Sequence, residues 1–365
     1  MVKKRKKLVE VDSNDGVVQL GNTFFPNPEL VPTGSTLFNL ALSDNPYGGW
    51  RRGSICNLVG DRDTGKTFLA LNMFAEACLC DTLDDYDFIY DEPEQKLDLP
   101  IGALFGKATG ERLKTKPSSS LIEDLYVNIE KKFNKKDANP FLYVLDSFDS
   151  LSDVEEMAKT ELKRDYPAKP RLASELFRKV KGRIRETQSL LLVVSQVRQN
   201  IGVTFGDKYT RAGGKALGHY ATQEAWLAVL KKIKKKERQN GVHVKVRVKK
   251  NHYNGKLRDV EFDIVQNYGV DDIGSMIDWM CIEGFWKKTA KKIDTGVDFQ
   301  ALIDLETERL QASKPKPKEY TGVEKEKLAK YIDENNLEND LIQIVATCWK
   351  EIEDSLVMDR KNRYE

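Results

Sequence analysis

A glycine-rich stretch that ends in a lysine and a threonine has the G-x-x-x-x-G-K-[ST] pattern of a phosphate-binding loop. It follows an apolar run at 54–59 and precedes helical apolar spacing from Phe68 to Cys80. Glycines let backbone amides turn toward phosphate oxygens, and the helix N-terminus adds a partial positive charge. The lysine can reach β- and γ-phosphates, and the threonine hydroxyl can bind Mg²⁺. We therefore expect a nucleotide to bind at Gly60, Asp61, Arg62, Asp63, Thr64, Gly65, Lys66, Thr67 and Phe68.

Two further apolar runs end in carboxylates that are suited to a metal ion and to a water molecule. The run 141–145 ends in Asp146, and ligands bind at the carboxyl ends of strands in open parallel sheets. We predict that Asp146 holds Mg²⁺ opposite Thr67, through water. The run 88–90 ends in Asp91 and Glu92, which could supply a base that orients an attacking water. An acidic surface loop explains this second pair equally well, because acidic residues crowd the segment 81–94.

The segment after the apolar run 190–194 has the composition of a nucleic-acid-binding loop. The run leads to the amide Gln196, and a glycine-rich, basic and partly apolar segment follows. Cations in such a segment can contact phosphates, and apolar side chains can lie against bases. The residues with this potential are Arg198, Ile201, Phe205, Arg211 and Lys215. A surface loop without a ligand is the alternative interpretation.

The elements that position these residues follow from the hydrophobic pattern. Short apolar runs alternate with longer amphipathic stretches between about residues 32 and 268, which predicts a mostly parallel sheet covered on both faces. The segments 242–248 and 260–265 alternate strictly and predict antiparallel strands at one edge.

We divide the chain into three parts. Residues 1–30 form a basic tail with a short strand at 17–20, residues 31–268 form the core, and residues 269–365 form a small, mainly helical domain. Helical spacing covers 273–286 and, as two helices, 324–358. The tryptophans at 279 and 286 are expected to pack in the core rather than against bases.

The composition excludes several classes of protein. The 365 residues are 40% hydrophobic and 32% charged, and no apolar run reaches the length of a membrane span. The net charge is only +2, so nucleic acid can be bound only by local basic patches. The five cysteines are irregularly spaced and do not group with the three histidines, which supports neither a zinc cage nor a disulfide framework. We expect reduced thiols and a cytoplasmic location.

Two local basic patches stand out. They are the tail 3–7 and the segment 231–238, which lies between two strand-like stretches. We expect a solvated chain end and a solvated hairpin tip. Contact of the tail with nucleic acid, and steering of duplex DNA by the hairpin, are the alternatives.

The order and spacing of these pieces resemble the RecA-type recombinases, the ATP-dependent proteins of homologous recombination. The resemblance covers roughly residues 17–290 and is most specific from Gln196 through Gly213 and Gly214 to Ala221. It implies an α/β fold: a RecA-like phosphate-loop ATPase core with a mainly parallel, partly mixed sheet, and a small, mostly helical C-terminal domain. It also implies ATP and Mg²⁺ as cofactors, single- and double-stranded DNA as partners, and a helical filament with ATP between protomers.

The resemblance also assigns roles to individual residues. Lys66 and Thr67 look like the phosphate and magnesium residues, Asp146 like the aspartate beside Mg²⁺, and Glu92 like the carboxylate that activates water. Gln196 is similar to the γ-phosphate sensor, and Lys250 to a lysine that reaches the ATP of the neighbouring protomer. The residues implied to bind DNA are Tyr166, Arg171, Arg178, Arg198, Ile201, Phe205, Arg211, Gly213, Gly214 and Lys215. In the C-terminal part, where the family gathers duplex DNA, Lys287, Lys288, Lys291 and Lys292 are weaker candidates.

Several departures mark a divergent member and keep other functions open. His252 stands where the family has a second lysine that acts across the interface, and His219 replaces an interface aromatic. The family's N-terminal helix has no counterpart before Val17, so weaker filaments, or filaments that depend on the strand at 17–20, are expected. The alternatives are an accessory protein that coats single-stranded DNA and hydrolyses ATP poorly, and a ring-shaped ATPase or helicase on the same core.

Overall fold

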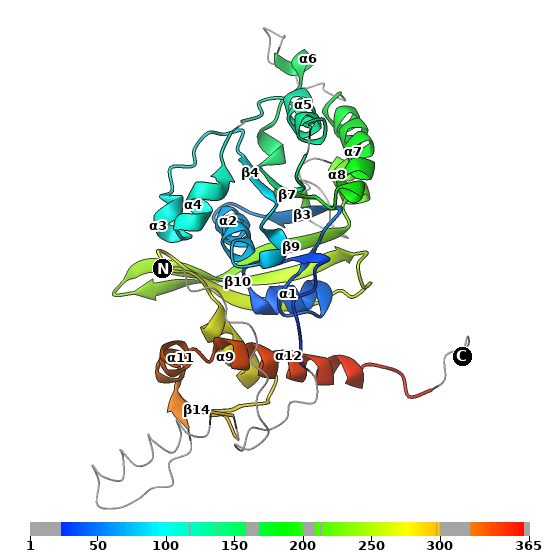
Figure 1. The fold of residues 1–365 in the computed structure, drawn as a ribbon. Coiled ribbons are helices and arrows are strands. Elements are labelled where there is room, and N and C mark those ends of the chain that lie inside the picture. The colour runs from blue at the N-terminus through cyan, green and yellow to red at the C-terminus, as the bar shows by residue number, and fades with distance from the viewer. Residues whose placement is uncertain are drawn as a thin grey trace, which may run out of the picture.

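The structure is a computed structural model that describes residues 23–116, 118–136, 138–157, 168–199, 209–211, 214–296, 298–299 and 322–360. Its centre is a ten-stranded sheet (Figure 1). The strand order is β12–β11–β10–β9–β3–β7–β6–β4–β5, and β8 pairs with β7. The strands are β3 (Ser54–Gly60), β4 (Asp87–Asp91), β5 (Leu113–Lys114), β6 (Phe141–Asp146), β7 (Leu190–Gln199), β8 (Tyr209–Arg211), β9 (Gln223–Lys235), β10 (Arg238–Asn251), β11 (Asp259–Val265) and β12 (Gly269–Asp271).

Six neighbouring strands of this sheet, from β9 to β5, are parallel. The edge formed by β10, β11 and β12 is antiparallel, and the short β8 pairs antiparallel with β7. The predicted mainly parallel, partly mixed sheet is therefore confirmed. In a parallel sheet the carboxyl ends of the strands meet at one edge, so the loops that follow β3, β4, β6 and β7 share a side of the molecule.

Alternate strand residues pack into two apolar cores, one on each face of the sheet. On β3, Cys56 and Leu58 join one core and Ile55 joins the other; on β7, Leu192 and Val193 divide in the same way. Burial on both faces explains why these strands have continuous apolar runs in the sequence. Helices α1 (Thr36–Ser43) and α2 (Lys66–Ala77) cover the first face, and α5 (Ile122–Phe133), α7 (Ala168–Glu186) and α8 (Gly214–Tyr220) cover the second (Figure 1).

The C-terminal part packs against the first face through α9 (Asp272–Ile282), α11 (Lys325–Glu334) and α12 (Glu338–Ser355). A three-stranded sheet of β13 (Lys287–Thr289), β14 (Lys292–Asp294) and β15 (Val323–Glu324) accompanies these helices and was not predicted. The helix predicted over 273–286 ends at Ile282, because Gly284 adopts a φ of 82° that turns the chain away. Trp279 and Trp286 are buried, as predicted.

The boundary proposed at residue 269 falls just before β12, and β12 still pairs with β11 of the large sheet. The predicted strand at 17–20 and the basic tail before it lie outside the described residues. The remaining short elements are β1 (Leu30–Val31), β2 (Trp50–Arg51), η1 (Asp81–Leu83), α3 (Ile101–Leu104), α4 (Lys107–Arg112), η2 (Phe148–Ser150) and α6 (Val154–Met157). Among the described helices, none combines the length and the apolar character that a membrane crossing requires.

Candidate nucleotide and DNA site

The phosphate loop lies between the end of β3 and the start of α2, and two glycines shape it. A Cβ on Gly60 would lie 2.7 Å from Thr64 Oγ1. A Cβ on Gly65 would lie 2.5 Å from Ile264 Cδ1, and Gly65 has a φ of 87° that other residues rarely adopt. The Thr64 hydroxyl donates to the carbonyl of Asp61 at 2.9 Å and closes the loop. The backbone amides of such a loop, and those of the first turn of the helix that follows it, can bind phosphate.

The Lys66 ammonium lies inside this loop. Its Nζ donates to the carbonyl oxygen of Asp61 at 2.5 Å, and only 9% of the residue is exposed. Burial lowers the pKa of Lys66, and the nearby carboxylates of Asp146 and Asp61 act against that shift. A cation held among backbone carbonyls and carboxylates can exchange these partners for phosphate oxygens when a nucleotide enters.

Thr67 and Asp146, the two residues predicted to hold Mg²⁺, are in direct contact. The Thr67 hydroxyl donates to Asp146 Oδ2 at 2.6 Å, and the Tyr90 hydroxyl donates to the same oxygen at 2.6 Å. Burial and the Asp146 charge raise the pKa of Tyr90, so the phenol remains a donor. A hydroxyl beside a carboxylate is the oxygen donor set that Mg²⁺ prefers, and these residues fit the ion. Tyr90 was missed in the sequence, although it immediately precedes the carboxylates 91 and 92.

The structure separates the two carboxylates at the end of β4. Asp91 is fully buried and accepts hydrogen bonds from the backbone and side chain of Ser119 and from the Tyr143 hydroxyl. Burial raises the pKa of Asp91, and these donors account for its oxygens. Glu92 is only partly buried, and its carboxylate accepts from the amides of Lys96 and Leu97 at 2.9–3.1 Å. Of the two, Glu92 is therefore the carboxylate that water can reach.

Gln196 lies beside the phosphate loop, because strand register pairs it with Gly60. Its backbone amide donates to Asp149 Oδ2 at 2.7 Å, and Asp149 lies on η2, just after Asp146. Lys169, near the start of α7, donates from Nζ to the carbonyl oxygens of Asp149 and Leu151. The turn after Asp146 thus contacts Lys169, in the segment 166–171 that is the first predicted to bind DNA, and Gln196, on the strand that leads into the second, 198–214. Asp149 was not predicted, and its only signal in the sequence is its position three residues after the predicted metal ligand.

The predicted DNA-binding residues that the structure describes lie on α7, β7, β8 and α8. Arg171 and Arg178 are exposed on α7, while Arg198 on β7 and Arg211 on β8 belong to paired strands. Gly214 and Lys215 begin α8. The remaining predicted residues, Tyr166, Ile201, Phe205 and Gly213, lie outside the described part of the chain.

Lys250 is not brought to the phosphate loop of its own chain. It lies near the end of β10, and its Nζ donates to the carbonyls of Gly218 and His219 at 2.8 and 3.1 Å, at the C-terminus of α8. His252 follows and is exposed in a pocket of about 340 Å³. The pocket borders Ser54, which begins β3, whereas the phosphate loop follows the other end of that strand. Its other basic lining residues are Arg51, Arg52, Lys181 and Arg185.

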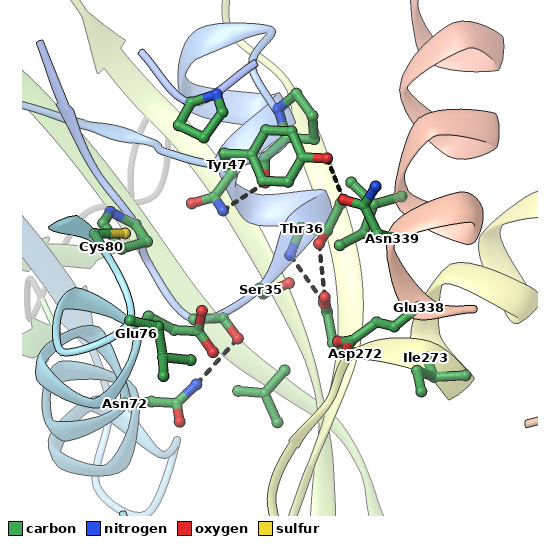
Figure 2. Close-up of a pocket in the computed structure, with 18 of the residues that line it drawn as sticks. Ser35, Thr36, Tyr47, Asn72, Glu76, Cys80, Asp272, Ile273, Glu338 and Asn339 are labelled. Atoms are coloured by element: carbon green, nitrogen blue, oxygen red, sulfur yellow. Dashed lines mark hydrogen bonds between the residues drawn. The ribbon is translucent and has the colours of Figure 1, made fainter. Parts of the chain in front are cut away.

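A larger pocket, of about 930 Å³, lies away from the phosphate loop, between α1, α2, α9 and α12 (Figure 2). Asp272, at the start of α9, accepts from the Thr36 amide at 2.8 Å and from the Thr36 hydroxyl at 2.6 Å. Burial raises the pKa of Asp272 to about 7. Glu76 on α2 and Glu338 on α12 also line the pocket, and Figure 2 shows them on opposite sides of it. The pocket lies between the core and the C-terminal helices, and none of the predicted site residues lines it.

Comparison with known proteins gives one family over most of the chain. The RecA N-terminal domain family matches residues 4–271. The chain is 28% identical to the protein RecA of Kineococcus radiotolerans over 285 residues, which cover 77% of this chain and 79% of that protein. It is 29% identical to RecA 2 of Myxococcus xanthus, covering 75% and 74%, and 27% identical to RecA of Geobacter sulfurreducens, covering 82% and 88%.

Proposed function

The chain belongs to the RecA family, and from this premise we propose that it is a DNA-dependent ATPase of recombinational DNA repair. It forms ATP-bridged filaments on single-stranded DNA and promotes homologous pairing and strand exchange. The observation that carries the proposal is the contact of Thr67 with Asp146 beside the buried ammonium of Lys66. Thr67 and Asp146 are about 80 positions apart in the sequence, and they meet at the edge of the sheet where the parallel strands end.

Nucleotide binding follows from the charges at this edge. The amides of the loop and of the first turn of α2 receive the phosphates, and Lys66 neutralises their charge. Thr67 and Asp146 would hold Mg²⁺, which supplies neutralising charge to the phosphate oxygens when it is bound. Tyr90 keeps Asp146 in place through its hydrogen bond to Oδ2.

Hydrolysis requires a base near the γ-phosphate, and we assign that role to Glu92. Its partner amides belong to Lys96 and Leu97 of its own turn. Both are backbone groups, which orient the carboxylate without supplying a compensating cation. A carboxylate held in this way can accept a proton from water.

Coupling to DNA runs, in this proposal, through the turn that follows Asp146. Asp149 binds the amide of Gln196 where β7 leads to the second DNA segment, and the carbonyl of Asp149 binds Lys169 where α7 follows the first. A change at the γ-phosphate that moves Gln196 would alter both segments. ATP then biases the chain toward the conformation that grips DNA, and hydrolysis releases it.

The position of Lys250 supports an assembly in which protomers stack head to tail. Lys250 and His252 lie toward the end of β3 that is opposite the phosphate loop. Contact between one end of a protomer and the other end of the next is heterologous, and such contacts produce open helices or rings. We propose the open filament, with Lys250 directed to the nucleotide of the neighbouring protomer.

The test is ATP hydrolysis by the full chain with and without long single-stranded DNA. Lys66→Ala removes the phosphate cation and Glu92→Gln removes the base, so both should abolish DNA-stimulated hydrolysis. Glu94→Gln is the matched control, because Glu94 lies on the same turn but its carboxylate accepts from Ser150 and Lys96. Glu92→Gln should keep ATP-dependent DNA binding, which Lys66→Ala should lose.

Two other outcomes would replace the proposal. Hydrolysis that DNA does not change would indicate a ring-shaped ATPase. Absence of hydrolysis with ATP-dependent coating of single-stranded DNA would indicate the accessory protein and would remove Glu92 from its role.

A further inference from the structure

The pocket of about 340 Å³ at the end of the protomer opposite the phosphate loop is strongly basic. Its lining holds a single carboxylate, that of Glu29. Four lysine and arginine side chains and one histidine also line it: Arg51, Arg52, Lys181, Arg185 and His252. Within the described part of the chain, none of these four cations takes part in an ion pair. A concave surface with this much uncompensated positive charge can bind an anion.

Of the four cations, Arg51 is the one that combines a fixed position with unused hydrogen-bond donors. Arg52 is only 9% exposed, and its guanidinium already donates to the Thr82 hydroxyl at 2.7 Å. Lys181 and Arg185 are exposed on the last two turns of α7, where long side chains keep many rotamers. Arg51 is half-buried, and no described residue accepts a hydrogen bond from its guanidinium.

Contacts of the backbone and of the side chain hold Arg51 in place. It follows Trp50, which is 2% exposed and packs on Phe38 with ring centroids 5.3 Å apart. The Arg51 amide donates to Gln223 Oε1 at 2.8 Å, and the guanidinium carbon lies 5.7 Å from the centroid of the Tyr253 ring. A guanidinium that lies over an aromatic face keeps the N–H groups of its planar fork available for phosphate oxygens. Arg51 is therefore a preorganised donor for an anion.

The Arg51 guanidinium lies beside the end of β10 that the proposed function places against the next protomer. Tyr253, over which it lies, directly follows His252, and Lys250 precedes His252 by two residues. The His252 amide donates to the Thr222 carbonyl at 2.9 Å, and Thr222 lines the same pocket as Arg51. In a head-to-tail stack this end meets the phosphate-loop end of the neighbour, where the anion is the triphosphate of the bound nucleotide.

The choice of an arginine matters because a histidine occupies position 252. An imidazole is mostly uncharged at neutral pH, whereas a guanidinium is always protonated and can bind phosphate oxygens through two parallel hydrogen bonds. His252 therefore leaves this end of the protomer short of a permanent positive charge. Arg51 lies in the same pocket and can supply that charge.

We propose that Arg51 is a catalytic residue that acts across the protomer interface, where its guanidinium contacts the γ-phosphate of the nucleotide held by the neighbouring protomer. The inference rests on the proposed function and adds a residue of β2 to its reaction. Water attacks the γ-phosphorus, its proton passes to Glu92 of the protomer that holds the nucleotide, and the bond to the bridging oxygen breaks to release ADP. Arg51 neutralises negative charge on the transferred phosphoryl group and on that bridging oxygen.

The first measurement is ATP hydrolysis on long single-stranded DNA by the full chain and its Arg51→Gln and Arg51→Lys variants. Loss of the guanidinium should lower turnover at least about 100-fold, and lysine, which keeps the charge but not the fork, should restore part of it. Lys330→Gln is the matched control, because Lys330 is exposed on α11 and lies 3.5 Å from Glu334. Its turnover should equal that of the parent.

A mixing experiment separates action across the interface from action within one protomer. Arg51→Gln is mixed in equal amounts with Glu92→Gln, which lacks the base but keeps Arg51. In a random filament about a quarter of the interfaces join an intact Glu92 to an intact Arg51, so the mixture should recover about a quarter of the parental turnover. The double variant Arg51→Gln/Glu92→Gln, used in place of Glu92→Gln, leaves no intact interface and should give no recovery.

Assembly on single-stranded DNA as a function of ATP concentration distinguishes failure of this inference from failure of the proposed ATPase, because assembly does not require hydrolysis. The ATP concentration for half-maximal assembly should rise at least about fivefold in Arg51→Gln, since one charge-assisted contact to the nucleotide is lost. Parental turnover and a parental ATP requirement in Arg51→Gln would overturn the inference, as would an equal loss in Lys330→Gln. A mixture no more active than its two components, with a lower melting temperature for Arg51→Gln, would assign Arg51 a structural role instead.

Discussion

Asp149 Oδ2 accepts the backbone amide of Gln196 at 2.7 Å, and this bond joins the turn after β6 to the end of β7. The two residues are separated by 47 positions. Gln196 is paired in register with Gly60, and Asp149 follows Asp146 by three residues. The bond therefore connects the proposed magnesium side of the nucleotide site with the strand that leads to the second DNA segment.

Asp149→Ala should uncouple hydrolysis from DNA, because it removes the acceptor that fixes the Gln196 backbone. We expect the ratio of DNA-stimulated to DNA-independent turnover to fall by about fivefold, which corresponds to about 1 kcal/mol for one hydrogen bond. Asp149→Asn keeps an acceptor oxygen and should restore most of the ratio. A purely structural role would predict instead that both rates and the melting temperature fall together in both variants.

Thr67→Val should lower ATP hydrolysis by about 100-fold at saturating Mg²⁺, since loss of a metal-binding hydroxyl removes a few kcal/mol of charge stabilisation. Valine retains the shape of threonine, so the melting temperature without nucleotide should change little. The Mg²⁺ concentration for half-maximal turnover should rise in the same variant. An unchanged Mg²⁺ requirement in Thr67→Val would contradict the assignment.

Stability should depend on pH through Asp272. Burial raises its pKa to about 7, and the carboxyl faces Thr36 of α1, Glu76 of α2 and Glu338 of α12. A raised carboxyl pKa means that the native state holds a proton that the unfolded state has lost. The protonated carboxyl contributes its full stabilisation below about pH 4, and this contribution is lost as the pH rises through about 7. Its upper bound in the free energy of unfolding is about 4 kcal/mol.

Asp272→Asn should therefore flatten the pH dependence of the free energy of unfolding, measured with urea between pH 5 and pH 8. Asparagine carries no titrating proton and still accepts from the Thr36 amide. Asp354→Asn, at an exposed position on α12, serves as a control for the loss of one carboxylate. Equal slopes in the parent and in Asp272→Asn would show that Asp272 does not titrate in this range.

How much of the structure could be predicted from the sequence depended on the kind of interaction. The phosphate loop was predictable because its glycines and Lys66 lie within eight positions and their spacing dictates their geometry. The pairing of Thr67 with Asp146 was expected from the rule that ligands gather at the carboxyl ends of parallel strands. Tyr90 and Asp149 could not be foreseen, since their roles depend on which strands are neighbours and in what register. The small β13–β14–β15 sheet was missed because strands of two or three residues carry no measurable periodicity.

His252 should make turnover depend on pH in a way that a lysine would not. It is exposed in the basic pocket near the start of β3, at the end of the protomer opposite the phosphate loop. An imidazole gains its positive charge as the solution becomes slightly acid, whereas an ammonium is charged throughout this range. We expect that the ratio of turnover in His252→Lys to turnover in the parent is larger at pH 8 than at pH 6. Parallel measurements on Lys250→Ala establish how much turnover depends on this end of the protomer. Identical pH profiles for His252→Lys and the parent would refute a role of the imidazole at the interface.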